Sequence, residues 1–258
     1  MRNFIALFFV IVIHLKGFSQ IHEMGMFLGG SNTISDIGST HFIYSNSPAF
    51  GLIYKWNLTT RYALRASFIS STLKSSDYYA NDMSRFNRFF EVNNNVVEFS
   101  AGMEVNFFDF NLHDQDREFS PYFFTGINYF QYQLFTVREG LGSIDVEKYD
   151  SSLEFSIPAI VGVKFSVSDS LVLSFETGFR YSLTDNIDGS NPIGQFENDL
   201  QVKHGELYNN DWYVFTGLAL SYTFGRQPCY CKERRKMFMS INLIMLLLSW
   251  RVMADGLN

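Results

Sequence analysis

The sequence is poor in charged residues, cysteine and proline. Asp, Glu, Lys and Arg make up 18% of its 258 residues, whereas ordinary soluble domains carry about 25%. Both cysteines stand in one three-residue stretch, Cys229-Tyr230-Cys231, so a disulfide framework cannot hold the fold. The formal charge of −6 argues against nucleic acid as a partner, because nucleic-acid-binding faces concentrate Lys and Arg.

Motifs for several kinds of chemistry are also missing. The chain has no phosphate-binding loop, dinucleotide fingerprint, paired-cysteine zinc pattern or Gly-x-Ser-x-Gly elbow. None of His22, His41, His113 and His204 stands on a strand beside an evident serine and acidic partner. The segment 185–191 is weakly similar to a calcium loop, but Ile187 occupies a position that needs a ligand, so we interpret it as an Asx-rich turn. We predict a protein that is not an enzyme, with no catalytic residue, cofactor or metal.

Aromatic residues are abundant, with 28 Phe, 14 Tyr and 3 Trp amounting to 17% of the chain. Helical periodicity is scarce, and the recurring pattern has period two, which is typical of strands with two unlike faces. In 212–224, for example, large apolar residues alternate with Gly217, Ala219, Ser221 and Thr223. The pattern predicts eight strands, at 22–30, 49–57, 61–71, 97–107, 122–137, 153–165, 171–181 and 212–224.

The predicted connections differ in length in a regular way. Those at 57–60 and 166–170 are tight and 109–120 is moderate, whereas 31–48, 72–94, 138–152 and 184–210 are long and polar. Outer-membrane barrels have short periplasmic turns at one rim and long extracellular loops at the other. We therefore predict an all-β fold, an eight-stranded antiparallel up-and-down transmembrane β-barrel in the lipid bilayer of the outer membrane. A soluble lipocalin-like barrel is the alternative, but the small, weakly charged second face suits a narrow lumen better than a solvated surface.

The second face carries a limited set of charges, which this fold would point inward. An eight-stranded barrel is only wide enough for its side chains to fill, and an unpaired buried charge costs several kcal/mol. We therefore expect a paired charge network that plugs the lumen, with no appreciable pore. Its predicted members are Glu23, Lys55, Arg65, Glu98, Glu104, Glu154, Lys164, Glu176 and Arg180.

The two ends of the chain differ from its middle. Residues 1–19 have the pattern of a cleaved signal peptide, with Arg2, an apolar stretch at 4–13 and Gly17-Phe18-Ser19 at the cleavage site, so the barrel would occupy 20–225. Residues 226–258 comprise a basic, cysteine-containing segment and an apolar tail from Met237. The tail could be an interfacial helix, a docking segment or a non-functional extension.

An even strand count places both barrel ends on the short-turn, periplasmic side, and with them Cys229 and Cys231. Cysteines separated by one residue can close only a strained ring. In an oxidising compartment an unpaired thiol suggests an intermolecular bond. We expect a covalent or tight link to a periplasmic partner, while idle thiols or chance metal capture stay open as alternatives.

A glycine-rich motif follows the first predicted strand and comprises Gly29, Gly30, Ser31 and Asn32, followed by Asp36 and Gly38. Further short motifs stand at 61–65, Pro121-Tyr122 with Gly126, and 229–232. Together they resemble the PorG-like outer-membrane proteins of Bacteroidetes type IX secretion systems, the later motifs more weakly than the first. The similarity covers about residues 20–232, with departures at Thr33 and Ser35.

The resemblance implies an accessory barrel that is not itself the protein-conducting pore. Such a barrel would anchor a periplasmic ring, formed by a PorK-like lipoprotein and a PorN-like protein, to the outer membrane. It also implies that Cys229 and Cys231 form the link to that ring. Two other functions remain as alternatives: a small surface barrel whose long loops bind an extracellular partner, and a lipid-modifying barrel enzyme.

Overall fold

The computed structural model describes residues 21–225, with gaps at 39–42, 44, 80–82, 84–89, 112–117, 140–143, 200–201 and 204–209. The predicted signal peptide, His41, His113, His204, Cys229, Cys231 and the apolar tail lie outside the described residues. Within the described part of the chain, no helix has the length and apolar character needed to cross a membrane.

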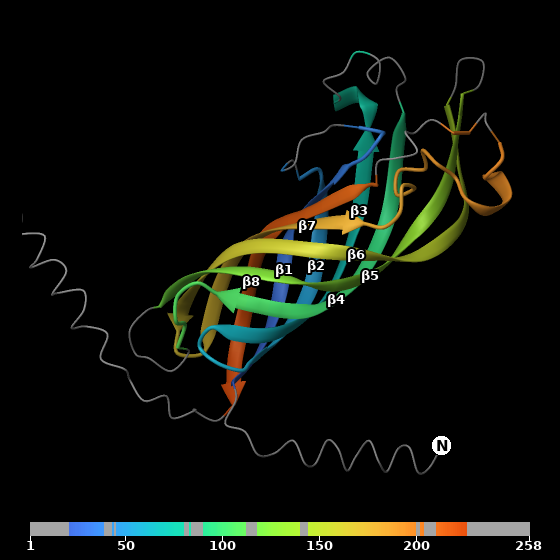
Figure 1. Ribbon diagram of the computed structural model, residues 1–258. Helices are drawn as coiled ribbons and strands as arrows, with labels where there is room; N and C mark the ends of the chain where they lie inside the picture. Colours follow the sequence, from blue (N-terminus) through green and yellow to red (C-terminus); the bar gives the residue numbers. More distant parts are fainter. Residues whose placement is uncertain are drawn as a thin grey trace, which may run out of the picture. The chain divides into compact units, whose positions relative to one another are not determined.

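Eight antiparallel strands form one closed barrel in which each strand pairs with its sequence neighbours and β1 pairs with β8 (Figure 1). The predicted fold class is confirmed. Two short 3₁₀ helices, η1 (Asp77–Tyr79) and η2 (Gly194–Phe196), follow β3 and β7. The strands are β1 (Ile21–Ile34), β2 (Ser47–Asn57), β3 (Tyr62–Ser76), β4 (Glu91–Asn106), β5 (Phe119–Glu139), β6 (Ile144–Ser168), β7 (Leu171–Ser182) and β8 (Trp212–Gly225).

Side chains alternate between the outside and the lumen, as the period-two pattern requires. In β3 the odd-numbered positions are mostly buried and the even-numbered positions mostly exposed. The exposed positions carry large apolar groups around the barrel, among them Met26, Phe68 and Leu220 at 62%, 48% and 51% exposure. A continuous apolar outer wall of this kind fits lipid contact, because exposing so much apolar area to water would cost a large free energy.

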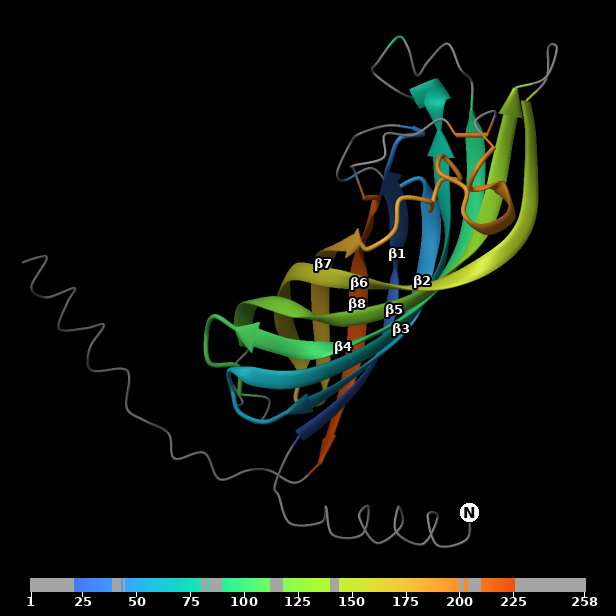
Figure 2. The same ribbon diagram turned by 45° about the vertical axis from the view of Figure 1, so that its right-hand side comes forward.

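Several strands extend farther than the sequence pattern predicts. β6 begins at Ile144, nine residues before the predicted start, and β3 and β4 continue to Ser76 and back to Glu91. The loops predicted at 72–94 and 138–152 are therefore partly strand. Figure 2 shows the consequence: the β5–β6 hairpin rises past the ends of β7 and β8 on the long-loop side.

The lumen also contains larger side chains than the expected Gly, Ser, Thr and Ala. A cluster of buried residues, including Phe27, Phe130, Tyr213 and Phe215, fills its upper part towards the long loops. Part of the aromatic content of the chain therefore lies inside the barrel. Glycine pairs make room for the rings: a side chain at Gly29 or Gly217 would overlap Phe27 and the opposing strand.

Candidate functional site

The lower lumen holds a cluster of five charged side chains centred on Glu104. Both lysines approach Glu104 closely, Lys55 Nζ at 2.8 Å from Oε2 and Lys164 Nζ at 2.8 Å from Oε1. Arg65 Nη1 lies 3.6 Å from the same carboxylate. Arg65 also binds Glu176 in a two-pronged arrangement, donating from Nη1 and Nη2 over 2.8 and 2.7 Å. Three bases therefore share two acids, and all five side chains are at 3% exposure or less.

Aromatic rings cover the excess positive charge of this cluster. Lys55 Nζ lies 5.0 Å from the centre of the Tyr122 ring, and Lys164 Nζ lies 4.8 Å from that of Phe110. Ring faces attract cations, most strongly where water is excluded. The Tyr122 hydroxyl also donates a hydrogen bond to Glu176.

A second, smaller cluster lies around Glu98. Its Oε1 accepts hydrogen bonds from Nη2 of Arg180 at 2.9 Å and from Nε at 3.3 Å. Its Oε2 accepts from Asn128 Nδ2 at 3.0 Å and from the Tyr213 hydroxyl at 2.9 Å. The Arg180 guanidinium lies 4.5 Å from the Phe215 ring centre. The carboxylate thus has a partner on each oxygen, which a buried charge requires.

Of the nine residues predicted to form the lumen network, the structure places eight inside at 2% exposure or less. Glu23 is among them and accepts a hydrogen bond from Asn57 Nδ2 at 2.7 Å. Glu154 is only half-buried, nearer the long-loop rim, and the structure does not bring it into either cluster. Without Glu154 the buried set has four acids and four bases. This balance suits a sealed, structural lumen better than a conduction path.

Sequence reasoning missed the neutral members of the network, Tyr122, Asn128 and Tyr213. All three are buried on β5 or β8, strands that carry none of the predicted charges. The alternation along these two strands was the signal that could have found them. Among the described residues, no group of three or more His, Cys, Asp or Glu is arranged to hold a metal ion.

At the long-loop rim, buried aspartates hold the loops after β1 and β7. Asp188 Oδ2 accepts from the Ile37 amide at 2.9 Å and so joins the two loops, whereas Asp211 Oδ2 accepts from the Ile187 amide at 2.8 Å within the loop after β7. Asp188 also accepts from the Ser190 amide through Oδ1, the local geometry of an Asx turn. The loops after β1 and β7 therefore form one packed layer.

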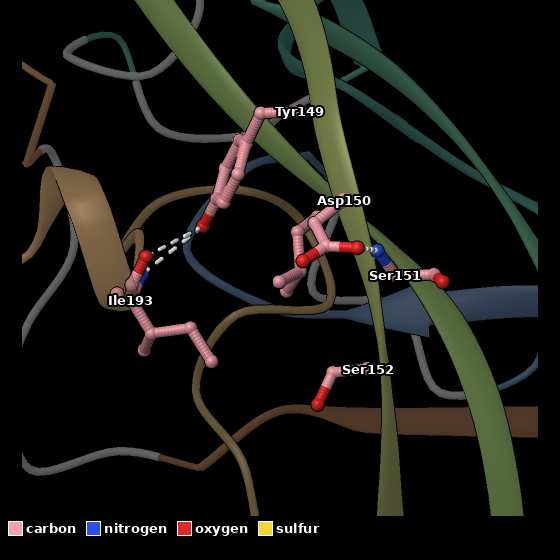
Figure 3. A pocket seen from close by; sticks show the side chains of 7 residues that line it. Tyr149, Asp150, Ser151, Ser152 and Ile193 are labelled. Carbon is pink, nitrogen blue, oxygen red and sulfur yellow. Dashed lines mark hydrogen bonds between the residues drawn. The ribbon is translucent and has the colours of Figure 1, made fainter.

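A pocket of about 420 Å³ lies beside this layer, between β6 and the loop that carries η2. Figure 3 shows Tyr149 crossing from β6 to Ile193, where its hydroxyl donates to the backbone oxygen at 3.0 Å and accepts from the amide at 3.2 Å. The pocket is lined by Leu134, Tyr149, Asp150, Ser151, Ser152, Ile193 and Gly194.

A sequence model of the family described as "Domain of unknown function (DUF6089)" matches residues 1–233. The chain belongs to the DUF6089 family. The matched region includes Cys229 and Cys231 as well as the whole barrel. No curated protein matches the chain.

Solved structures similar to this DUF6089 chain include three bacterial outer-membrane barrels. The attachment invasion locus protein Ail of Yersinia pestis covers 80% of this chain with its whole length, at 11% identity and a TM-score of 0.44. Neisserial surface protein A covers 80% of this chain with 98% of its own length, at 9% identity and a TM-score of 0.42. A major outer membrane protein of Thermus thermophilus covers 80% of this chain with its whole length, at 13% identity and a TM-score of 0.42. These likenesses concern the fold.

The six residues of the resemblance motif occupy structural positions in this DUF6089 barrel. Gly30 packs against Ser45, and the Ser31 and Ser71 hydroxyls share a 2.7 Å hydrogen bond. Gly38 has φ +102° and donates its amide to Asp77 Oδ1 at 2.8 Å, a conformation that favours glycine. Asn32 and Asp36 are buried nearby. The motif thus closes the first long loop over the lumen.

The loop layer of this DUF6089 barrel is expected to loosen as pH rises. Burial, and then the neighbouring charge of Asp36, raises the pKa of Asp185 to about 7 from an ordinary 3.8, and burial and Asp188 raise the pKa of Asp211. Between pH 3.8 and about 7, Asp185 keeps its proton in the folded loop and releases it when the loop opens. The stabilisation is therefore present at low pH and is lost as pH rises through about 7.

Hydrogen exchange of the Ile187 and Ser190 amides, corrected for intrinsic rates, tests this at about pH 5.5 and about pH 8.5. Protection should be clearly lower at the higher pH in the wild type. In Asp185→Asn, which cannot ionise, the difference should shrink. Equal pH dependence in the two proteins would contradict the assignment.

Proposed function

We propose that this barrel is a non-enzymatic accessory component of a type IX-like protein secretion machine in the outer membrane. The observation that carries the proposal is the filled lumen, in which seven buried charged groups form ion pairs and the eighth, Glu23, is hydrogen-bonded to Asn57, all at 2% exposure or less. Such a barrel suits anchoring better than conducting. The resemblance over residues 20–232 supports the choice of machine.

The topology supports an anchoring role on the periplasmic side. Ile21 pairs with Gly225 at the rim that also carries the tight turn after Asn57, and short turns mark the periplasmic rim of outer-membrane barrels. The chain therefore leaves the barrel on that side, ahead of Cys229 and Cys231. We propose that these cysteines link the barrel to a periplasmic ring of PorK-like and PorN-like proteins.

Deleting residues 227–232 is expected to abolish cargo secretion while the barrel still inserts into the outer membrane, because the link to the ring is lost. Secreted cargo and the folded barrel are measured in the same cells. A six-residue deletion at 204–209, in the long loop after β7, is the matched control and should leave secretion intact. Normal secretion by the 227–232 deletion would refute the role.

The double variant Cys229→Ser, Cys231→Ser separates a covalent link from a docking segment. If the link is a disulfide, non-reducing gels of wild-type membranes contain a heavier adduct that the double variant lacks.

The pocket at the long-loop rim favours a second candidate function, binding of an extracellular partner. Loss of function on deleting 204–209, with 227–232 dispensable, would favour that candidate.

A further inference from the structure

Among the described residues, one edge of β6 has no strand beside it over its upper half. β7 pairs with β6 only from Ser156 to Ser168, whereas β6 begins at Ile144. Within the described part of the chain, no strand pairs with this edge between residues 144 and 155. Unpaired strand edges present rows of backbone donors and acceptors that can accept a further strand.

The direction of the backbone groups along this edge follows from the neighbouring hydrogen bonds. The Leu183 amide donates to the Phe155 carbonyl at 3.0 Å, so Phe155 faces the β7 side. Alternate residues of a strand face the same side, which directs the amide and carbonyl of Leu153 and Ser151 to the free edge. Pro158, of opposite parity, faces β5 at the point where the β5–β6 pairing is interrupted.

The protein partly protects this edge at its upper end. Asp150 Oδ1 accepts the Ser151 amide at 2.8 Å. Tyr149, the extra residue at the β5–β6 register shift, binds both backbone groups of Ile193. Beside this clamp lies the 420 Å³ pocket, which Tyr149 to Ser152 line on the β6 side (Figure 3), within the ~300–1,000 Å³ range of ligand sites.

We propose that this slot binds an extended, basic segment of another protein, which adds as a strand to the free edge of β6. The stretch from Tyr149 to Phe155 would accommodate about five residues at ~3.3 Å each. Main-chain hydrogen bonds to both backbone groups of Leu153 and to the Ser151 carbonyl would supply the affinity, as in other cases of strand addition.

The charge around the slot selects a basic partner. The two segments that contain most of its lining residues, 146–154 and 193–199, carry five acids and one base. Asp150 lines the slot itself, and opposite charges across an interface favour correct partners and repel others. The five acids are Glu147, Asp150, Glu154, Glu197 and Asp199, and the base is Lys148.

The test uses the full chain in phosphatidylcholine nanodiscs and a fluorescent, end-capped heptapeptide of alternating Val and Lys. Fluorescence anisotropy should show binding to the wild type. A Val/Glu peptide should bind at least tenfold more weakly, and a Val/Lys peptide N-methylated at every residue should not bind measurably, because neither of its edges can donate. No binding of the unmodified Val/Lys peptide, or equal binding of the N-methylated one, overturns strand addition. Equal binding of the Val/Glu peptide overturns the basic preference.

Protein variants locate the site. Leu153→Pro removes an edge-facing amide that β5 does not use, a change that edge strands tolerate, and should weaken binding at least tenfold. Leu153→Ala, which retains the amide, is the matched control and should bind as the wild type does. Equal binding by these two variants, both running as folded barrels on unheated gels, overturns the assignment.

Gly194→Asn tests the opposite wall without altering β6. Gly194 has φ +71°, a region that Asn tolerates best among other residues, and a Cβ there would meet no atom within 4 Å. The new side chain should enter the slot and weaken binding at least tenfold. Unchanged affinity would place the peptide elsewhere. Neither variant touches residues 227–232, so the outcome is independent of the secretion assay.

Discussion

Glu104→Gln should lower the free energy of unfolding by about 3–5 kcal/mol, the usual cost of removing one partner from a buried ion pair. The glutamine has nearly the same shape, so the loss comes from the charge. Lys55, Lys164 and Arg65 would then share a single carboxylate, that of Glu176. Urea unfolding in lipid vesicles, followed by tryptophan fluorescence, measures the change.

Asp109→Asn is the matched control for this experiment. Arg61 and Asp109 also form an ion pair, at 2.5 Å, but both side chains are 41% exposed, and water and salt screen such pairs. No measurable shift is expected. Adding Lys164→Met to Glu104→Gln should restore part of the stability, because one of the excess cations is removed. Equal stability of Glu104→Gln and Asp109→Asn would show that the lumen charges do not hold the barrel together.

Gly102→Ala should destabilise the barrel by about 1–3 kcal/mol, since overpacking forces the backbone apart. Gly102 on β4 stands opposite Gly126 on β5. A Cβ at Gly102 would overlap the Thr125 carbonyl oxygen and lie 2.7 Å from the Gly126 Cα. The three nearest atoms all belong to the backbone of β5, so strand pairing itself must shift.

Ala101→Leu is the control for Gly102→Ala, on the same strand but on the opposite, exposed face. Its additional methyl groups would enter lipid and should cost little. The fraction of protein that folds into vesicles, followed by urea unfolding, compares the two variants. A larger loss in Ala101→Leu than in Gly102→Ala would contradict the close approach of β4 and β5.

The sequence pattern predicts the strand number and the inward charges because lipid imposes a simple rule on each spanning strand: large apolar residues alternate with small or polar ones. This alternation is required only in the part of each strand that lies within the membrane. Residues 144–152 include Asp145, Glu147, Lys148 and Asp150, and were assigned to a loop for that reason. They form a strand above the spanning part, where both faces can be polar.

The pairing partners in the lumen could not be predicted from the sequence. Arg65 on β3 meets Glu176 on β7, which lies across the barrel. Such a contact depends on strand tilt and stagger, which no local pattern records. For the same reason Glu154 was grouped with the network, although its height along β6 places it near the rim. The cluster of buried aromatic residues in the upper lumen was not predicted either. Alternation along a strand separates inward from outward positions, but it does not show which inward positions lie at the same height.

The barrel is closed by pairing its first and last strands, in a register that runs from Ile21–Gly225 to Ile34–Trp212. Until β8 has been synthesised, β1 has an open edge along its whole length, and open edges of apolar strands promote aggregation. Contacts between the chain ends also form slowly. The barrel therefore cannot close before the last strand is made, and a truncation before Trp212 should leave a species that never closes.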